Sequence, residues 1–201
     1  MPKAIWSIAP RPVQTSTRDR IIDAAAMRFY AQGFHAVGLD AILEDVGVTK
    51  TTFYNHFESK DDLIVAVLAD RDQRDMDSLQ VELDARGGTA RDRILAVFDI
   101  LGEWFDDPEF KGCLFINATA QFPNPNDPIH QAAAAHGANM HRFYARLAAD
   151  LGASDPEMLA KQLCMLVVAG ITARHVSCDV DAAATAKHMA EALLDRAAPH
   201  G

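Results

Sequence analysis

The chain has 201 residues, of which 49% are hydrophobic and 23% are charged. This apolar content can bury a core, which excludes a mainly disordered protein, and no uninterrupted apolar stretch approaches the roughly 20 residues of a membrane-spanning helix. The formal net charge is −9, but residues 1–60 carry a balance of +1 and the rest −10, so only the N-terminal third suits a polyanionic partner.

The order of apolar and turn-forming residues predicts helices along most of the chain. Residues 1–15 contain three prolines and no periodicity, which predicts a flexible arm. Beyond it, apolar residues recur at three- and four-residue spacing, as on the buried face of a helix. The expected helices cover about 17–32, 39–46, 50–56, 60–85, 90–105, 113–121, 128–151, 156–177 and 181–198. No stretch alternates with period two, so the predicted class is all-α with about nine helices.

Residues 38–57, GLDAILEDVGVTKTTFYNHF, have the layout of a helix-turn-helix motif. Gly47 permits a sharp turn between two short helices, and Val46, Val48 and Phe53 are placed to pack those helices together. In this layout the N-terminal residues of the second helix meet base edges in the major groove. The polar residues left on that helix are Lys50, Thr51, Thr52, Tyr54, Asn55 and His56.

The run from Arg20 to Leu68 resembles the DNA-binding region of the tetracycline-repressor (TetR/AcrR) family of bacterial regulators. The matching elements are Ile22-Asp23-Ala24-Ala25, Phe29, Gly33-Phe34, Ile42, Val46-Gly47-Val48-Thr49-Lys50, Phe53-Tyr54, His56-Phe57 and Ser59-Lys60-Asp61-Asp62-Leu63. The resemblance implies a helix-turn-helix domain over 16–76 and an effector-binding and dimerisation domain over 77–201. It also implies a ligand-responsive regulator, usually a repressor, that binds a palindromic operator and is released by a small, largely apolar effector.

The DNA contacts expected from the chemistry and the resemblance divide into base and phosphate contacts. Lys50 can donate to guanine O6 and N7, and a threonine methyl group can meet the methyl group of thymine. The residues expected at phosphates are Tyr54, His56, Lys60, Arg18 and Arg20. The alternative is that Tyr54 and His56 are packing residues and that Lys60 is merely solvated. Gly38 stands where the family usually has Ser or Thr, so its side chain offers no phosphate contact.

The larger domain is expected to hold two further sites. The resemblance implies a homodimer formed by the last two helices, with the interface residues Leu159, Leu163, Leu166, Val167, Gly170, Ile171, Met189, Leu193 and Leu194. The alternative is that this stripe is buried within one subunit. An effector pocket is expected among the middle helices, lined by Trp104, Phe105, Phe110, Cys113, Phe115, Asn117, Gln121, Phe122, Met140, His141, Phe143, Tyr144 and His175. Taken singly, most of these residues equally fit a plain core.

Alternative functions rest on a few cysteine and histidine residues. Cys113 follows Lys111-Gly112 near a predicted helix start, where the pKa of a thiol is lowered. One alternative is therefore a redox- or electrophile-sensing regulator of the same fold. The other interpretation of Cys113 is a buried structural cysteine. His130, His136 and His141 could indicate a small metal-dependent enzyme, but their spacing spreads them around a helix. A non-specific architectural DNA binder is a third alternative. We expect no catalytic residue, metal or cofactor. With scattered cysteines and no signal peptide, we expect a cytoplasmic protein.

Overall fold

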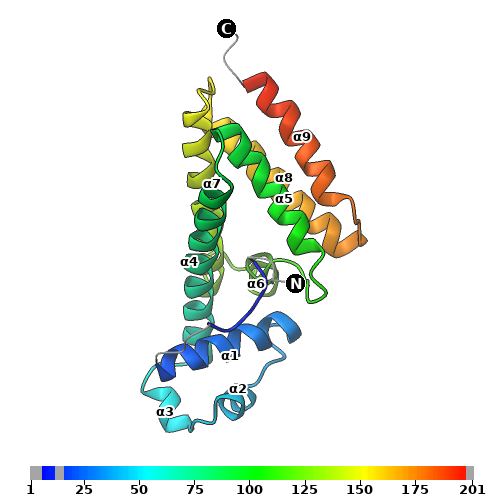
Figure 1. Cartoon of the computed structure of the whole chain (residues 1–201). Coiled ribbons are helices and arrows are strands. Elements are labelled where there is room, and N and C mark those ends of the chain that lie inside the picture. The colour runs from blue at the N-terminus through cyan, green and yellow to red at the C-terminus, as the bar shows by residue number, and fades with distance from the viewer. Residues whose placement is uncertain (1–5, 12–15, 198–201) are drawn as a thin grey trace. The chain divides into compact units, whose positions relative to one another are not determined.

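The computed structural model describes residues 6–11 and 16–197. Within these ranges the chain forms helices and turns without a strand, which confirms the all-α class (Figure 1). The helices of the described residues are α1 (Thr17–Gln32), α2 (Leu39–Val46), α3 (Lys50–Tyr54), α4 (Lys60–Arg86), α5 (Ala90–Phe105), α6 (Leu114–Gln121), α7 (Pro128–Asp150), α8 (Pro156–Ser177) and α9 (Ala182–Ala197). Helix α3 ends two residues earlier than expected.

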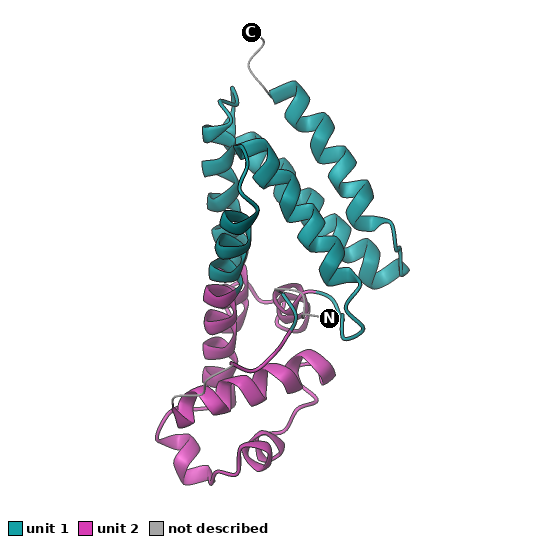
Figure 2. Ribbon diagram, in the orientation of Figure 1, with its two compact units in different colours: residues 1–7, 75–112, 136–201 teal, residues 8–74, 113–135 magenta. Residues whose placement is uncertain are grey.

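The chain divides into two compact units, each built from segments that are distant in sequence (Figure 2). The N-terminal unit comprises the described residues of 8–74 together with 113–135, and the C-terminal unit comprises 6–7, 75–112 and 136–197. One boundary between the units falls within α4, between Arg74 and Asp75. Helix α6 and the start of α7 therefore group with α1–α3, whereas the sequence suggested that everything after residue 76 forms the second domain.

Local capping explains why the helix-turn-helix forms where the sequence predicts it. Gly47 has φ +71° and ends α2, because a left-handed residue is most easily a glycine. The Thr49 side chain then accepts a hydrogen bond from the backbone N–H of Thr52 at 3.1 Å and caps α3. Phe53, fully buried, attaches the short helix to the rest of the unit and stacks on Phe57 with ring centroids 5.4 Å apart.

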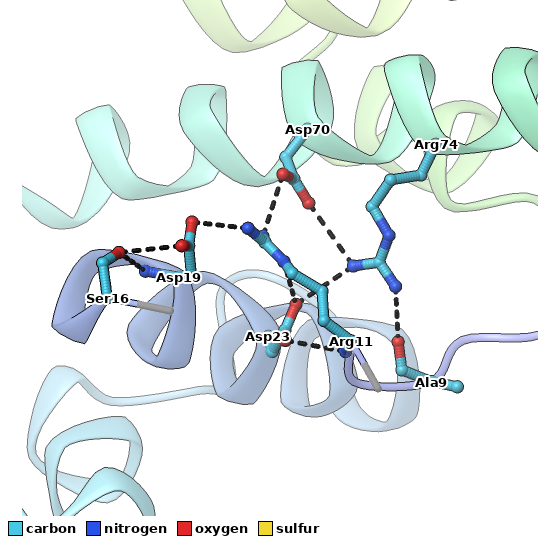
Figure 3. A network of polar contacts seen from close by, with 7 residues as sticks. All are labelled: Ala9, Arg11, Ser16, Asp19, Asp23, Asp70 and Arg74. Carbon is cyan, nitrogen blue, oxygen red and sulfur yellow. Dashed lines mark hydrogen bonds and ion pairs between the residues drawn. The ribbon is translucent and has the colours of Figure 1, made fainter. Parts of the chain in front are cut away.

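A network of ion pairs holds residues 8–11 against α1 and α4 (Figure 3). The backbone N–H of Arg11 donates to the carboxylate of Asp23 at 2.9 Å, and its guanidinium binds Asp70 at 2.8 Å. Arg74 binds Asp23 at 3.0 Å and donates to the carbonyl oxygen of Ala9 at 2.8 Å. This part of the expected flexible arm is therefore packed; residues 1–5 and 12–15 of that arm lie outside the described residues.

In the C-terminal unit, α5, α8 and α9 pack against one another. Trp6, the start of the described chain, is buried there and meets the ring of Trp104 edge-on, with centroids 5.8 Å apart. Gly170 of α8 faces α5 and α9, because a Cβ added to it would be in ordinary van der Waals contact with Leu101 at 3.5 Å and Ala186 at 3.6 Å. The small residue expected at a subunit interface thus serves packing within the protomer.

Candidate functional site

The helix-turn-helix presents its polar residues outward from α3. Phe53 is the buried residue of this helix, and Tyr54 is 58% exposed, although its ring is largely apolar. The exposed residues predicted to contact DNA here are Lys50, Thr51, Tyr54, Asn55 and His56, while Thr52 is half-buried beside its cap. In the helix-turn-helix layout, exposed polar residues near the start of the second helix are the ones placed to meet base edges.

Lys50 is not free on this surface, because its ammonium pairs with a carboxylate on the preceding helix. Lys50 Nζ lies 2.8 Å from Asp40 Oδ1, and both side chains are well exposed, at 61% and 76%. The hydrogen bond and the charge of Asp40 raise the pKa of Lys50, so the lysine remains protonated at every physiological pH. The sequence reading placed Lys50 at a base edge but gave Asp40 no role.

The other cationic side chains predicted to contact phosphate differ in whether they already hydrogen-bond to groups within the unit. Arg18 lies over the ring of Phe57, with 5.2 Å from its guanidinium carbon to the ring centroid, and remains exposed. The guanidinium of Arg20 donates to the carbonyl oxygen of Val46, where it satisfies the end of α2. Arg18 thus keeps its donors available to a phosphate, whereas Arg20 shares them with the backbone.

Lys60 is held more firmly than a solvated lysine. Its ammonium donates to the carbonyl oxygen of Phe34 at 2.7 Å and lies 5.9 Å from the ring centroid of Phe29. The side chain thereby fixes the loop between α1 and α2 to the start of α4. A phosphate contact from Lys60 would have to share this ammonium.

The loop between α1 and α2 is also held from the other side by the end of α6. Gln121 Oε1 accepts hydrogen bonds from the backbone N–H of Phe34 at 2.9 Å and of His35 at 3.4 Å. His35 Nε2 donates to the carbonyl oxygen of Gln121 at 3.1 Å, and its ring lies 4.7 Å from that of Phe122. Gln121 and Phe122, expected at the effector pocket, therefore brace the DNA-binding unit.

We expect Gln121→Met to lower the free energy of unfolding by about 1 kcal/mol, because the methionine fills the space but leaves two backbone N–H groups without their acceptor. Urea unfolding measures this change. Gln121→Glu is the matched control: both variants lose the amide donor to the carbonyl oxygen of Asn117 at 3.4 Å, but a carboxylate can still accept both backbone bonds and should lose less stability. Equal loss in both variants would assign the effect to packing and not to the hydrogen bonds.

The remaining residues predicted for the effector pocket fall in both units. In the C-terminal unit, the rings of Trp104, Phe105 and Phe110 form an aromatic cluster that the exposed His175 meets edge-on. The other predicted residues of this unit are Met140, Phe143 and Tyr144, which are buried, and His141, which is partly exposed. In the N-terminal unit, α6 carries the buried Phe115 and the half-buried Asn117.

Tyr144 is the unusual member of this set. Its hydroxyl is buried and has no hydrogen-bond partner among the described residues. Burial and the nearby Cys164 raise the pKa of Tyr144 well above its ordinary value, and burial raises the pKa of the Cys164 thiol to about 11. Both groups are therefore neutral at physiological pH, and the hydroxyl is available to a polar atom that reaches it.

The cysteine and histidine residues behind the alternative functions take other roles. Cys113 is the N-cap residue of α6, as its expected place at a helix start implies, and it is only 9% exposed. His130 Nδ1 donates to the carbonyl oxygen of Phe122 at 2.8 Å, and His141 Nε2 lies 3.6 Å from a carboxylate oxygen of Glu157. Within the part of the chain that the structure describes, no three His, Cys, Asp or Glu residues gather as a metal site would require.

The apolar stripe proposed for dimerisation lies partly inside the protomer. The members buried within it are Leu159, Leu163, Gly170, Ile171 and Leu194. Those that stay half-buried or exposed are Leu166, Val167, Leu193 and Met189. Burial within one subunit, the alternative considered from the sequence, therefore holds for five of the nine residues, which cannot offer their side chains to a partner.

Helix α8 instead exposes a second apolar stripe on its opposite face. Its exposed members are Met158, Met165, Val168, Thr172 and Val176. The middle of this stripe lines a groove of about 710 Å³ together with the exposed Lys161 of α8 and with Gly137 and His141 of α7. By length and composition, α8 could cross a membrane, with 33% of its most apolar window buried. An apolar helix with one buried and one exposed stripe is typical of a surface that packs against another protein.

Two family models match the chain, one in each half. Residues 21–67 match the model described as bacterial regulatory proteins of the tetR family, and residues 90–194 match a tetracyclin repressor-like C-terminal domain. The first match covers the helix-turn-helix and the second covers α5 to most of α9.

Known proteins agree with these matches. The HTH-type transcriptional regulator YjdC of Escherichia coli (strain K12) is 30% identical over 182 residues, which cover 88% of this chain and 93% of the relative. SCO4454, a TetR-family transcriptional regulator from Streptomyces coelicolor, has a TM-score of 0.82 at 31% identity over 92% of this chain and 91% of its own. Reduced NemR of E. coli, with a TM-score of 0.81 at 21% identity over 88% and 95%, supports the fold alone. The chain belongs to the tetR family of bacterial DNA-binding transcriptional regulators.

Proposed function

We propose that the protein is a cytoplasmic repressor that binds a palindromic operator as a homodimer and leaves it when a small, largely apolar effector binds the C-terminal unit. The observation that carries the DNA-binding part is the outward row of Lys50, Thr51 and Tyr54 on α3, held in place by the buried Phe53. Exposed polar side chains at the start of the second helix of a helix-turn-helix are the ones that this layout brings to base edges.

The homodimer is supported by the exposed stripe of α8. Met165 is 64% exposed and Val168 is 50% exposed, and both lie beside the groove next to α7. A second copy that covers this stripe would remove apolar surface from water at about 25 cal/mol per Å². Two copies related by a twofold axis present two recognition helices, which read half-sites about 34–36 Å apart.

The effector part is supported by Tyr144 in α7 and by the family. A buried hydroxyl without a partner costs about 1–3 kcal/mol, which a bound acceptor or donor would recover. The neighbouring Met140 and Phe143 are apolar and buried. This chemistry suits a mainly apolar molecule with a single polar atom.

The function is tested by selecting duplexes that the purified protein retains from a random DNA pool. We expect a twofold-symmetric consensus that is bound at least about 1,000-fold more tightly than random DNA. Tyr54→Ala should lose most of this affinity and keep its melting temperature, because the ring is exposed. Compounds are then screened for their ability to release the protein from the consensus duplex, and fluorescence anisotropy measures this release. A wild-type protein that selects no consensus would contradict the proposal.

A further inference from the structure

The pair formed by Asp40 and Lys50 joins the two helices of the helix-turn-helix on its open surface. Asp40 belongs to the first turn of α2 and Lys50 is the first residue of α3. Their charged atoms lie 2.8 Å apart, with both side chains more than half exposed. An exposed pair of this kind contributes little to the stability of a fold.

The carboxylate of Asp40 weakens the sequence-independent attraction of this surface to DNA phosphates. The N-terminus of a helix and a lysine ammonium both attract phosphate regardless of sequence. Here one residue opposes both, because Asp40 occupies the first turn of α2 and also binds Lys50. Gly38, the N-cap of α2, adds no side-chain hydrogen bond of its own. The Asp40–Lys50 pair therefore binds a phosphate weakly and is better suited to a partner that offers both a hydrogen-bond acceptor and a donor.

A G·C base pair is such a partner. In the major groove guanine presents the acceptors O6 and N7, and cytosine presents the N4 amino group as a donor. O6 and N4 are hydrogen-bonded to each other within the pair, so they lie about 2.9 Å apart. The Lys50 ammonium and the Asp40 carboxylate oxygen lie 2.8 Å apart, the ordinary length of an ion-paired hydrogen bond, so the two groups are close enough to meet neighbouring atoms of one base pair together.

Building on the proposed function, we propose that Asp40 and Lys50 together read one G·C pair in each half-site. Lys50 donates to guanine and Asp40 accepts from the cytosine amino group, while the ion pair between them is kept. Asp40 is thus a specificity-determining residue with two effects: it recognises cytosine, and it keeps Lys50 from binding a phosphate on unrelated DNA.

The test repeats the selection from random duplexes with the full chain carrying Asp40→Ala, Asp40→Asn or Lys50→Ala. Asp61→Ala is the matched control, because Asp61 is an exposed carboxylate in the first turn of α4. Melting temperatures verify folding, and Asp40→Asn keeps the size of the side chain should alanine disturb α2. Affinity for a fixed random duplex is measured as a function of salt.

We expect Lys50→Ala and Asp40→Ala to relax the same position of the consensus, which is G·C in the wild type, with discrimination there falling at least about fivefold. On random DNA, both Asp40 variants should bind more tightly, with a salt slope steeper by about 0.9 per protomer, as the released Lys50 finds a phosphate. Asp61→Ala should relax no position.

Three results would overturn the inference while leaving the proposed function intact. Asp40→Ala could relax no position, it could relax a position different from that of Lys50→Ala, or the shared position could favour a pair other than G·C. A wild-type protein without any consensus would instead remove the proposed function and this inference with it.

Discussion

Asp23→Ala is expected to lower the free energy of unfolding by about 3 kcal/mol. The Asp23 side chain is 1% exposed and binds both Arg11 and Arg74, so its loss removes the buried one of the two carboxylates that these guanidinium groups share. The value lies at the lower end for a broken buried pair, because these arginines are 20% and 30% exposed and can recover some hydration.

Urea unfolding of the full chain measures this difference, and Asp70→Ala is the control. Asp70 binds the same two arginines, at 2.8 and 3.5 Å, but is 24% exposed. Asp70→Ala should therefore lower the free energy of unfolding by about 1 kcal/mol or less. Similar losses in both variants would mean that burial of Asp23 contributes nothing beyond an ordinary surface ion pair.

Val168→Asp is expected to convert the proposed dimer into a monomer and to reduce operator affinity by about 100-fold or more, since the two half-sites are then bound independently. Val168 is 50% exposed in the protomer, so a carboxylate there remains hydrated and leaves the fold intact. In a dimer that covers the α8 stripe, the same carboxylate would lose its hydration without a partner.

Sedimentation measures the oligomeric state and fluorescence anisotropy measures DNA affinity. Val81→Asp is the control, because Val81 is also exposed, at 69%, but belongs to α4. It should leave both quantities unchanged. A Val168→Asp protein that stays dimeric at micromolar concentration would place the interface on another surface.

Features that depend on neighbouring residues were predictable from the sequence. The turn at Gly47 and the inward packing of Phe53 were expected from local pattern, and the structure has both. For α8, local sequence pattern could not show which face of the helix is buried within the protomer. Leu163 and Met165 are both apolar and lie two positions apart, yet one packs inside the protomer and the other is exposed. A helix that is apolar all round carries no signal of which stripe a partner would cover.

Contacts between residues that are distant in sequence could not be predicted from local pattern either. Gln121 and Phe34 are 87 positions apart, so no spacing rule could show that an amide placed among aromatic residues serves the α1–α2 loop. Asp23 did leave a signal, because a carboxylate within the apolar stripe of α1 must be paired if it is buried. Its partner Arg11 lies in a proline-bordered segment with no periodicity, where sequence pattern cannot indicate a contact.

The two bonds to Phe34 affect which changes its loop can accept. Lys60 binds the carbonyl oxygen of this residue and Gln121 binds its amide, so α4 and α6 both attach to main-chain atoms of one residue. Main-chain bonds survive the exchange of most side chains, proline excepted, but they do not survive a shift of the chain by one position. Within the segment 33–37, the exposed Ala36 should therefore accept substitution, whereas the buried Phe34 and Val37 should not. An insertion or deletion anywhere in the segment should break both main-chain attachments at once.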